Sequence, residues 1–176
     1  MDFIFVTILG ALWGSFANVC ILRLPEDKGV VVGRSFCPNC KKLIIWKDNI
    51  PIISFLLLKG KCRQCKKPIS LQYTLVEILS LISFLSIYYY YGISITTLLL
   101  IILALIFIII FFIDLKHFII PNELTITLMV IGIIKSIDPD LNNEIFPNFI
   151  NSVLGGVIGY MLIWLIILFY KKVRNK

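Results

Sequence analysis

Charged residues are scarce in this sequence of 176 residues. They make up 15% of the chain, whereas hydrophobic residues make up 59%, and the mean hydropathy is +0.96. A soluble domain of this length is nearer half apolar, so the composition excludes an ordinary soluble protein and indicates a bilayer. The sequence also lacks an evident internal repeat or low-complexity linker. We therefore expect one membrane bundle with a single polar insertion, residues 23–73.

Five apolar stretches approach or exceed the roughly 20 residues that a helix needs to cross a bilayer. They are residues 3–22, 75–91, 93–113, 119–134 and 149–170, of which the fourth is the shortest. The first stretch has neither a basic start nor a small-x-small cleavage site, so it is predicted to be a retained helix and not a cleaved signal peptide. The predicted fold class is all-α, a polytopic membrane protein with about five transmembrane helices.

Acidic residues are few in the polar insertion, which has 11 basic residues against three acidic ones and a net charge of +8. Basic loops stay in the cytoplasm, so the insertion is predicted to be cytoplasmic and the N-terminus to lie outside. The later loops follow the same rule, because the fourth stretch leads to the acidic DPDLNNE and the fifth to the basic KKVRNK. The expected location is the inner (cytoplasmic) membrane, with several passes and a cytoplasmic C-terminus.

The insertion holds four cysteines as two CxxC pairs, Cys37 with Cys40 and Cys62 with Cys65. Each pair can direct two thiolates at one point, and the 21 residues between the pairs are close to the four-cysteine zinc pattern. Neighbouring lysines favour the thiolate form, and a reducing cytoplasm disfavours disulfides. We predict a structural zinc that supplies folding energy to a loop with a small core. The alternative is free cysteines, and Cys20, in the first stretch, is expected to be a packing residue.

Two carboxylates occur beside apolar stretches, where ionisable groups are costly. Asp114 ends the third stretch and Glu77 lies early in the second, and both are predicted near the cytoplasmic face. Each is either a functional group or an interfacial anchor, and His117 is expected to be interfacial. The first stretch also has three small residues at helical spacing, Gly10, Gly14 and Ser15. They predict close packing of this helix against another.

Taken together, these features resemble the type IV prepilin peptidases, the bifunctional leader peptidase/N-methyltransferases of bacterial membranes. The resemblance covers essentially the whole chain. It is carried by GSFANVCILRLP, by the cysteine stretch from GRSFCPNC to LQYTLVEIL, by IDLKHFIIPNELT and by LGGVIGYMLIWLIILFY. It implies a first transmembrane helix (1–22), a cytoplasmic zinc-binding loop (23–73) and the N-terminal part of a membrane peptidase domain (74–176).

The resemblance implies an aspartyl endopeptidase that cleaves prepilin-like leaders after a glycine at the cytoplasmic face. Asp114 matches the first catalytic aspartate of the family, and Glu77 and Asn18 are candidate supporting residues. The new N-terminal residue is then methylated from S-adenosylmethionine. The implied partners are prepilin and pseudopilin leader peptides, the lipid bilayer, and components of type IV pilus, competence or type II secretion systems.

A second catalytic aspartate is expected in a GxGD motif, and the 176 residues contain no such motif. Asp138 and Asp140 cannot take its place, because they are predicted on the outer side, across a helix roughly 25 Å long. The sequence is therefore expected to be a truncated fragment, to work with a second chain, or to have lost cleavage. We expect these residues alone to cleave prepilin at or near background.

Two alternatives remain open. One is a remnant that acts only as a methyltransferase, although no glycine-rich S-adenosylmethionine loop is recognisable. The other is a docking module for pilus or secretion proteins, in which the basic zinc loop makes the contacts. Nucleic acid is not an expected partner, because the loop is tethered to the membrane.

Overall fold

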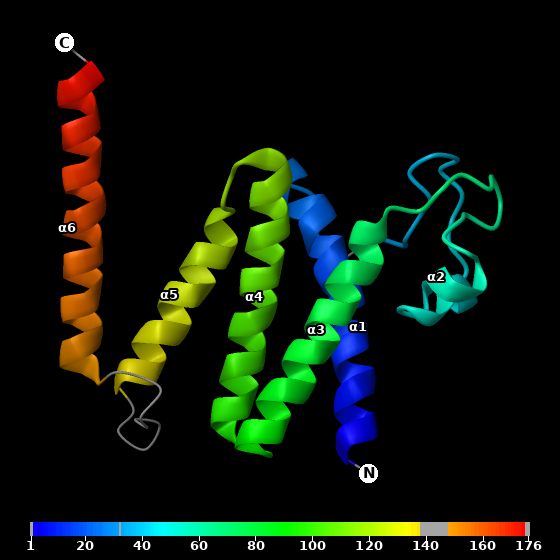
Figure 1. The fold of residues 1–176 in the computed structure, drawn as a ribbon, viewed down its shortest axis with the longest axis horizontal. Helices are drawn as coiled ribbons and strands as arrows, with labels where there is room; N and C mark the ends of the chain where they lie inside the picture. The colour runs from blue at the N-terminus through cyan, green and yellow to red at the C-terminus, as the bar shows by residue number, and fades with distance from the viewer. Residues whose placement is uncertain (1, 32, 138–147, 175–176) are drawn as a thin grey trace. The chain divides into compact units, whose positions relative to one another are not determined.

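The computed structural model describes residues 2–31, 33–137 and 148–174. Within them the chain forms six α-helices and no strand, which confirms the all-α prediction (Figure 1). The helices are α1 (Asp2–Arg23), α2 (Ile53–Leu57), α3 (Leu71–Tyr91), α4 (Ile95–His117), α5 (Asn122–Ile137) and α6 (Phe149–Arg174). Two short 3₁₀ helices, η1 (Leu24–Glu26) and η2 (Trp46–Asn49), lie in the polar insertion.

Four of these helices, α1, α3, α4 and α6, are long and apolar enough to cross a membrane. The fourth apolar stretch of the sequence forms α5, which has 16 residues and begins at Asn122, three residues later than the stretch itself. The later start of α5 has a local cause. Phe118 adopts a left-handed conformation that caps α4, and Pro121 directly precedes α5. A membrane crossing by α5 stays a prediction.

Serine and glycine residues define the ends of the two central helices. Ser70 accepts a hydrogen bond from the Gln72 N–H at the start of α3, and Ser94 accepts one from the Thr97 N–H at the start of α4. Gly92 ends α3 with a positive φ of 59°, which glycine adopts without steric cost. These caps make the turn between α3 and α4 short, so the two helices run antiparallel.

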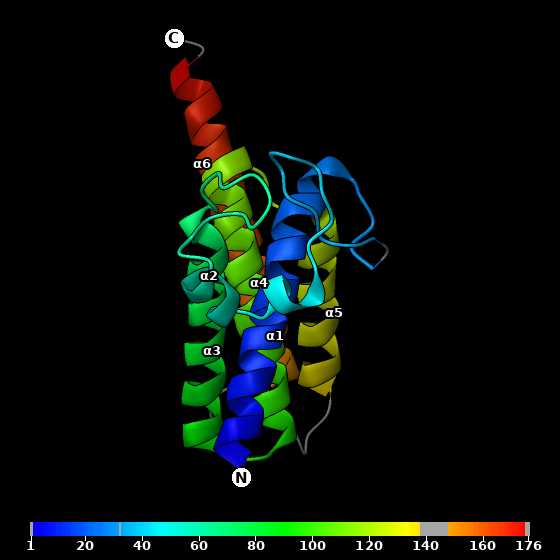
Figure 2. The ribbon, with the colours of Figure 1, turned by 90° about the vertical axis from the view of Figure 1, so that its right-hand side faces the viewer.

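The chain divides into two compact units, Met1–Thr125 and Ile126–Lys176. In the first unit, α1 and α4 run in one direction and α3 in the other (Figures 1 and 2). The end of α1, the start of α3 and the end of α4 therefore lie at the same end of this unit, together with the cysteine loop. Its core is apolar and comes from all three helices: Ala17, Cys20, Ile21, Val76, Phe84, Leu105, Ile109, Phe112 and Ile113.

Two glycines of α1 allow it to pack directly against the backbone of α3. A Cβ atom added to Gly10 would lie 2.9 Å from the Leu81 Cα, and one added to Gly14 would lie 2.7 Å from the Glu77 Cα. Real Cβ atoms essentially never approach so closely. The predicted close packing of the small residues is therefore confirmed for Gly10 and Gly14, in the manner of helix pairs in membranes.

Replacing Gly14 by alanine should destabilise the pairing of α1 with α3 by about 1–3 kcal/mol, because the obstructing atom belongs to a backbone and cannot rotate away. The measurement is denaturant-induced unfolding of the purified protein in detergent micelles. Gly156→Ala in α6 is the matched control, since its added Cβ meets nothing within 4 Å among the described residues. Equal stability of the two variants would contradict the proposed role of this glycine.

Candidate functional site

Two knuckles with the same sequence pattern, CxxCKK, bring the four cysteines together. In the first, the Cys37 N–H donates to the Lys42 carbonyl at 3.0 Å, and the Lys41 N–H donates to the Cys37 carbonyl at 2.9 Å. Residues 62–67 repeat both hydrogen bonds at 2.9 and 3.0 Å. Lys41 and Lys66 also share a φ of 58°. This short repeat was missed in the sequence, although the two CKK triplets signal it.

The four sulfur atoms of the knuckles form one cluster. The Sγ atoms of Cys37, Cys40, Cys62 and Cys65 all lie within 4.8 Å of one another, and those of Cys37 and Cys65 are 3.9 Å apart. Tetrahedral zinc with Zn–S bonds of about 2.3 Å needs sulfurs roughly 3.8 Å apart. The donor set and its spacing therefore fit a metal ion held by four thiolates. Cys20 is outside this cluster, in the core, as expected.

The cysteines do not ionise equally in the absence of a cation. Backbone N–H groups of Cys65 and Gln64 lower the pKa of the Cys62 thiol to about 7. The Lys67 N–H also favours a thiolate at Cys65, but desolvation and the neighbouring cysteine sulfurs outweigh it and raise the Cys65 pKa to about 11. One thiolate therefore forms readily in the cluster, and further thiolates are unfavourable next to it. A divalent metal ion compensates the repulsion between thiolates, because it deprotonates the thiols that coordinate it.

An ion pair braces the second knuckle against η2. Arg63 makes a two-pronged contact with the Asp48 carboxylate, with N–O distances of 2.7 and 2.8 Å. The Arg63 guanidinium lowers the pKa of Asp48, so the carboxylate stays charged to a lower pH than usual. The brace is lost only when the pH falls through this lowered pKa. It restrains one side of the cysteine loop at neutral pH.

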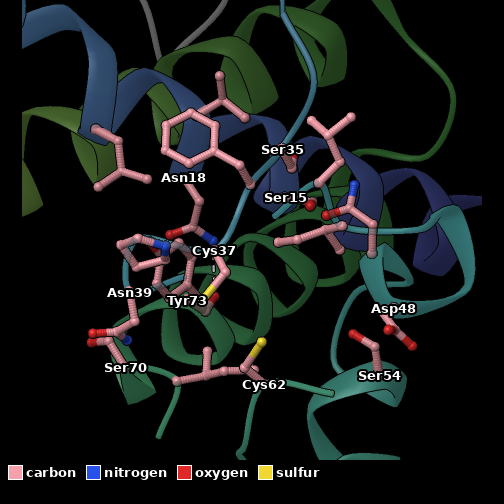
Figure 3. A pocket seen from close by; sticks show the side chains of 18 of the residues that line it. Ser15, Asn18, Ser35, Cys37, Asn39, Asp48, Ser54, Cys62, Ser70 and Tyr73 are labelled. Carbon is pink, nitrogen blue, oxygen red and sulfur yellow. Dashed lines mark hydrogen bonds between the residues drawn. The ribbon is translucent and has the colours of Figure 1, made fainter. Parts of the chain in front are cut away.

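A cavity of about 960 Å³ lies between the cysteine loop and the adjoining ends of α1 and α3. Figure 3 shows Ser15 and Asn18 from α1, Tyr73 from α3, and Cys37 and Cys62 from the loop around it. Of the carboxylates noted in the sequence, Glu77 lines this cavity and Asp114 does not. The structure thus brings the cysteines, Asn18 and Glu77 to one place.

Asn18 and Glu77 both connect distant parts of the chain. The Asn18 side chain donates to the Tyr73 carbonyl at 2.9 Å and to the Gly14 carbonyl at 3.3 Å, so it links α1 to α3. Glu77 accepts a hydrogen bond from the Ile52 N–H at 2.7 Å, so it links α3 to the cysteine loop. The sequence indicated polar residues at membrane depth but gave no signal of these partners.

Asp114 lies in the last turn of α4 and is exposed. Its carbonyl accepts the N–H of Phe118, the residue that caps the helix. Lys116, two residues further on, lines the cavity, and His117 is exposed. Asp114 is thus at the same end of the first unit as the cysteine loop. Asp138 and Asp140 lie outside the described residues.

Comparison with known proteins agrees with this architecture. The bacterial peptidase A24 N-terminal domain matches residues 8–91, and the type IV leader peptidase family matches residues 101–173. No solved structure matches the chain.

Several curated relatives carry the name prepilin leader peptidase/N-methyltransferase. The protein of Klebsiella pneumoniae is 32% identical over 98% of this chain and 76% of its own length. Those of Myxococcus xanthus and Neisseria gonorrhoeae are 34% and 35% identical over 90% and 96% of this chain, and 46% and 66% of their own lengths. The chain spans about half to two thirds of the length of most of these relatives. With both halves matched in order and relatives above 30% identity, the chain belongs to the type IV leader peptidase family.

Proposed function

We propose that this chain takes part in cleaving prepilin leaders after a glycine at the cytoplasmic face of the membrane, and in methylating the new N-terminus. The observation that carries the proposal is the placement of the four-cysteine cluster, the cavity and Asp114 at one end of the α1–α3–α4 unit. The family match supports the same reading. The substrates are the leader peptides of pilins or pseudopilins, and the partners belong to pilus, competence or type II secretion assembly.

In the proposed cleavage, Asp114 is one of two aspartates. Its position at the end of an apolar helix gives it access both to water and to a peptide that leaves the bilayer. One carboxylate of such a pair accepts a proton from the attacking water, and the other, protonated, polarises the scissile carbonyl. Two neighbouring carboxylates share a proton, which splits their pKa values and creates both roles. The second carboxylate is proposed to come from a GxGD segment, which the 176 residues do not contain.

The metal ion at the cysteine cluster is proposed to be zinc and to have a structural role. Four thiolates complete its coordination shell, so no position is left for water or substrate. The ion would clamp the two knuckles together and thereby shape the wall of the cavity, which includes Cys37 and Cys62. S-adenosylmethionine, when bound, would supply an activated methyl group for the N-terminal amine.

The cysteine loop is proposed to lie in the cytoplasm and the N-terminus outside, because the insertion carries a net charge of +8. Ile93, in the turn between α3 and α4, is 85% exposed and would then face the outside. We expect an impermeant maleimide added to intact cells to label Ile93→Cys and to spare Val31→Cys in the loop, both in a Cys20→Ala background. Labelling at residue 31 of Val31→Cys, with no labelling at residue 93 of Ile93→Cys, would show the opposite orientation.

The function is tested in liposomes that contain the purified protein, a synthetic prepilin peptide and S-adenosylmethionine. Mass spectrometry separates intact, cleaved and methylated peptide in one experiment. We expect cleavage near background from the 176 residues and efficient cleavage once a GxGD-bearing segment is added, fused or as a second chain. A chain that neither cleaves nor methylates in the presence of that segment would refute the proposed function.

A further inference from the structure

Glu77 is a buried carboxylate of the cavity, and it has no charged partner among the described residues. As far as the structure describes the chain, the cavity lining contains three carboxylates, and two of them are paired, Glu26 with Lys28 and Asp48 with Arg63. Glu77 is 9% exposed, and within the described part of the chain no lysine or arginine forms an ion pair with it. A buried carboxylate without a counter-charge is costly, so a cationic group of a ligand is favoured beside Glu77.

The backbone at Ile52, whose N–H binds the Glu77 carboxylate, is strained. Ile52, whose N–H binds the carboxylate, has φ 62° and ψ −52°, and the Ile53 N–H bonds back to the Pro51 carbonyl. This is the rarer, strained form of the γ-turn, and a β-branched residue seldom adopts it. Such strain persists where the surroundings determine it, and it concentrates at ligand and catalytic sites.

A second polar group of the cavity wall is also incomplete. Asn18 is 4% exposed, and its amide nitrogen donates to two carbonyls. These bonds fix the orientation of the amide, and its Oδ1 is left without a donor among the described residues. A buried acceptor without a donor costs free energy, so a ligand N–H is favoured there. The cavity volume of about 960 Å³ suits a ligand of drug-like size.

We propose that this cavity binds S-adenosylmethionine, with the cationic end of the ligand at the Glu77 carboxylate and a ligand N–H at Asn18 Oδ1. The inference rests on the proposed methyltransferase function and adds the site and its residues. S-adenosylmethionine carries a sulfonium and an α-ammonium, either of which would balance the Glu77 carboxylate, and it has N–H donors for Asn18 Oδ1. Lys41, Lys42 and Lys116 line the same cavity and would supply counter-charges for its single carboxylate.

The test is equilibrium binding to zinc-loaded protein in nanodiscs, with S-adenosylmethionine and 5′-methylthioadenosine as probes. The second probe keeps the adenosine and the sulfur but has neither cation. Glu77→Gln retains an acceptor for the Ile52 N–H and removes the charge. We expect this variant to bind S-adenosylmethionine at least about tenfold more weakly and 5′-methylthioadenosine within about twofold of wild type. Its zinc content, measured in parallel, should be unchanged.

Glu26→Gln is the matched control, because Glu26 lines the same cavity but is paired with Lys28. It should bind both probes within about twofold of wild type. Equal weakening of both probes by Glu77→Gln, or unchanged binding of S-adenosylmethionine, would overturn the site. If wild type binds and uses S-adenosylmethionine while Glu77→Gln binds it normally, the proposed function stands and this site is wrong. If wild type binds none, the methyltransferase half of the proposed function fails as well.

Discussion

Replacing Asp114 by asparagine should reduce prepilin cleavage by roughly a thousandfold or more in the chain supplemented with a GxGD segment. Asparagine keeps the size of the side chain but can neither accept a proton from water nor share one with a partner carboxylate. Members of a catalytic unit act together, so losing one removes most of the rate enhancement. The rate is measured in the liposome assay from the amount of cleaved peptide.

Two observations make this prediction specific to catalysis. Asp114 is exposed, and its backbone carbonyl, which the substitution does not change, accepts the hydrogen bond from Phe118. The substitution should therefore leave the fold and the zinc content unchanged. Glu123→Gln, a carboxylate in the first turn of α5, serves as the control and should cleave normally. Undiminished cleavage by the Asp114→Asn enzyme would refute the assignment. Efficient cleavage by the 176 residues alone would instead refute the need for a second aspartate, and Glu77 would become the first candidate partner.

Removing one cysteine from each knuckle, in a Cys37→Ser and Cys62→Ser double variant, should abolish zinc binding. The wild-type protein should contain about one zinc per chain, and the double variant close to none. Two sulfurs remain, and they cannot complete a tetrahedral shell. Because metal binding is coupled to folding of small loops, the cysteine loop should also become sensitive to protease. Metal analysis and limited proteolysis of purified protein measure the two effects.

Cys20→Ala is the matched control for the zinc prediction, since Cys20 is a buried cysteine in α1 and lies outside the cluster. It should retain zinc and protease resistance of the loop. The pairing of α1 with α3 should survive in the double variant, because it depends on Gly10 and Gly14 and not on the loop. Wild-type protein that is folded and free of metal after purification without chelator would contradict the prediction.

Local patterns in the sequence accounted for the features that depend on neighbouring residues. Apolar stretches predicted the long helices, paired CxxC motifs predicted the sulfur cluster, and the spacing of Gly10 and Gly14 predicted the close helix contact. Each of these signals is contained within one helix or one knuckle. The exact start of α5 was missed by three residues, because it depends on the left-handed cap at Phe118.

The connections around the cavity could not be predicted in the same way. Ile52 and Glu77 are 25 residues apart, and Asn18 and Tyr73 are 55 residues apart. Nothing in the sequence near Ile52 requires a positive φ, because the conformation is held by a carboxylate on another helix. Tertiary contacts decide these positions, so the sequence indicated the polar residues but not their partners.

Lys116 shows how closely the two proposed reactions would be joined in space. It lies two residues after Asp114 in the last turn of α4, and it also lines the cavity next to the cysteine loop. A cleaved pilin that keeps its apolar segment in the bilayer would have to move only sideways, along the membrane plane, for its fresh amine to reach that cavity. The new amine would then reach the cavity by a short diffusion within the membrane plane, and methylation would follow cleavage within one encounter. Free, unmethylated pilin should therefore be a short-lived species.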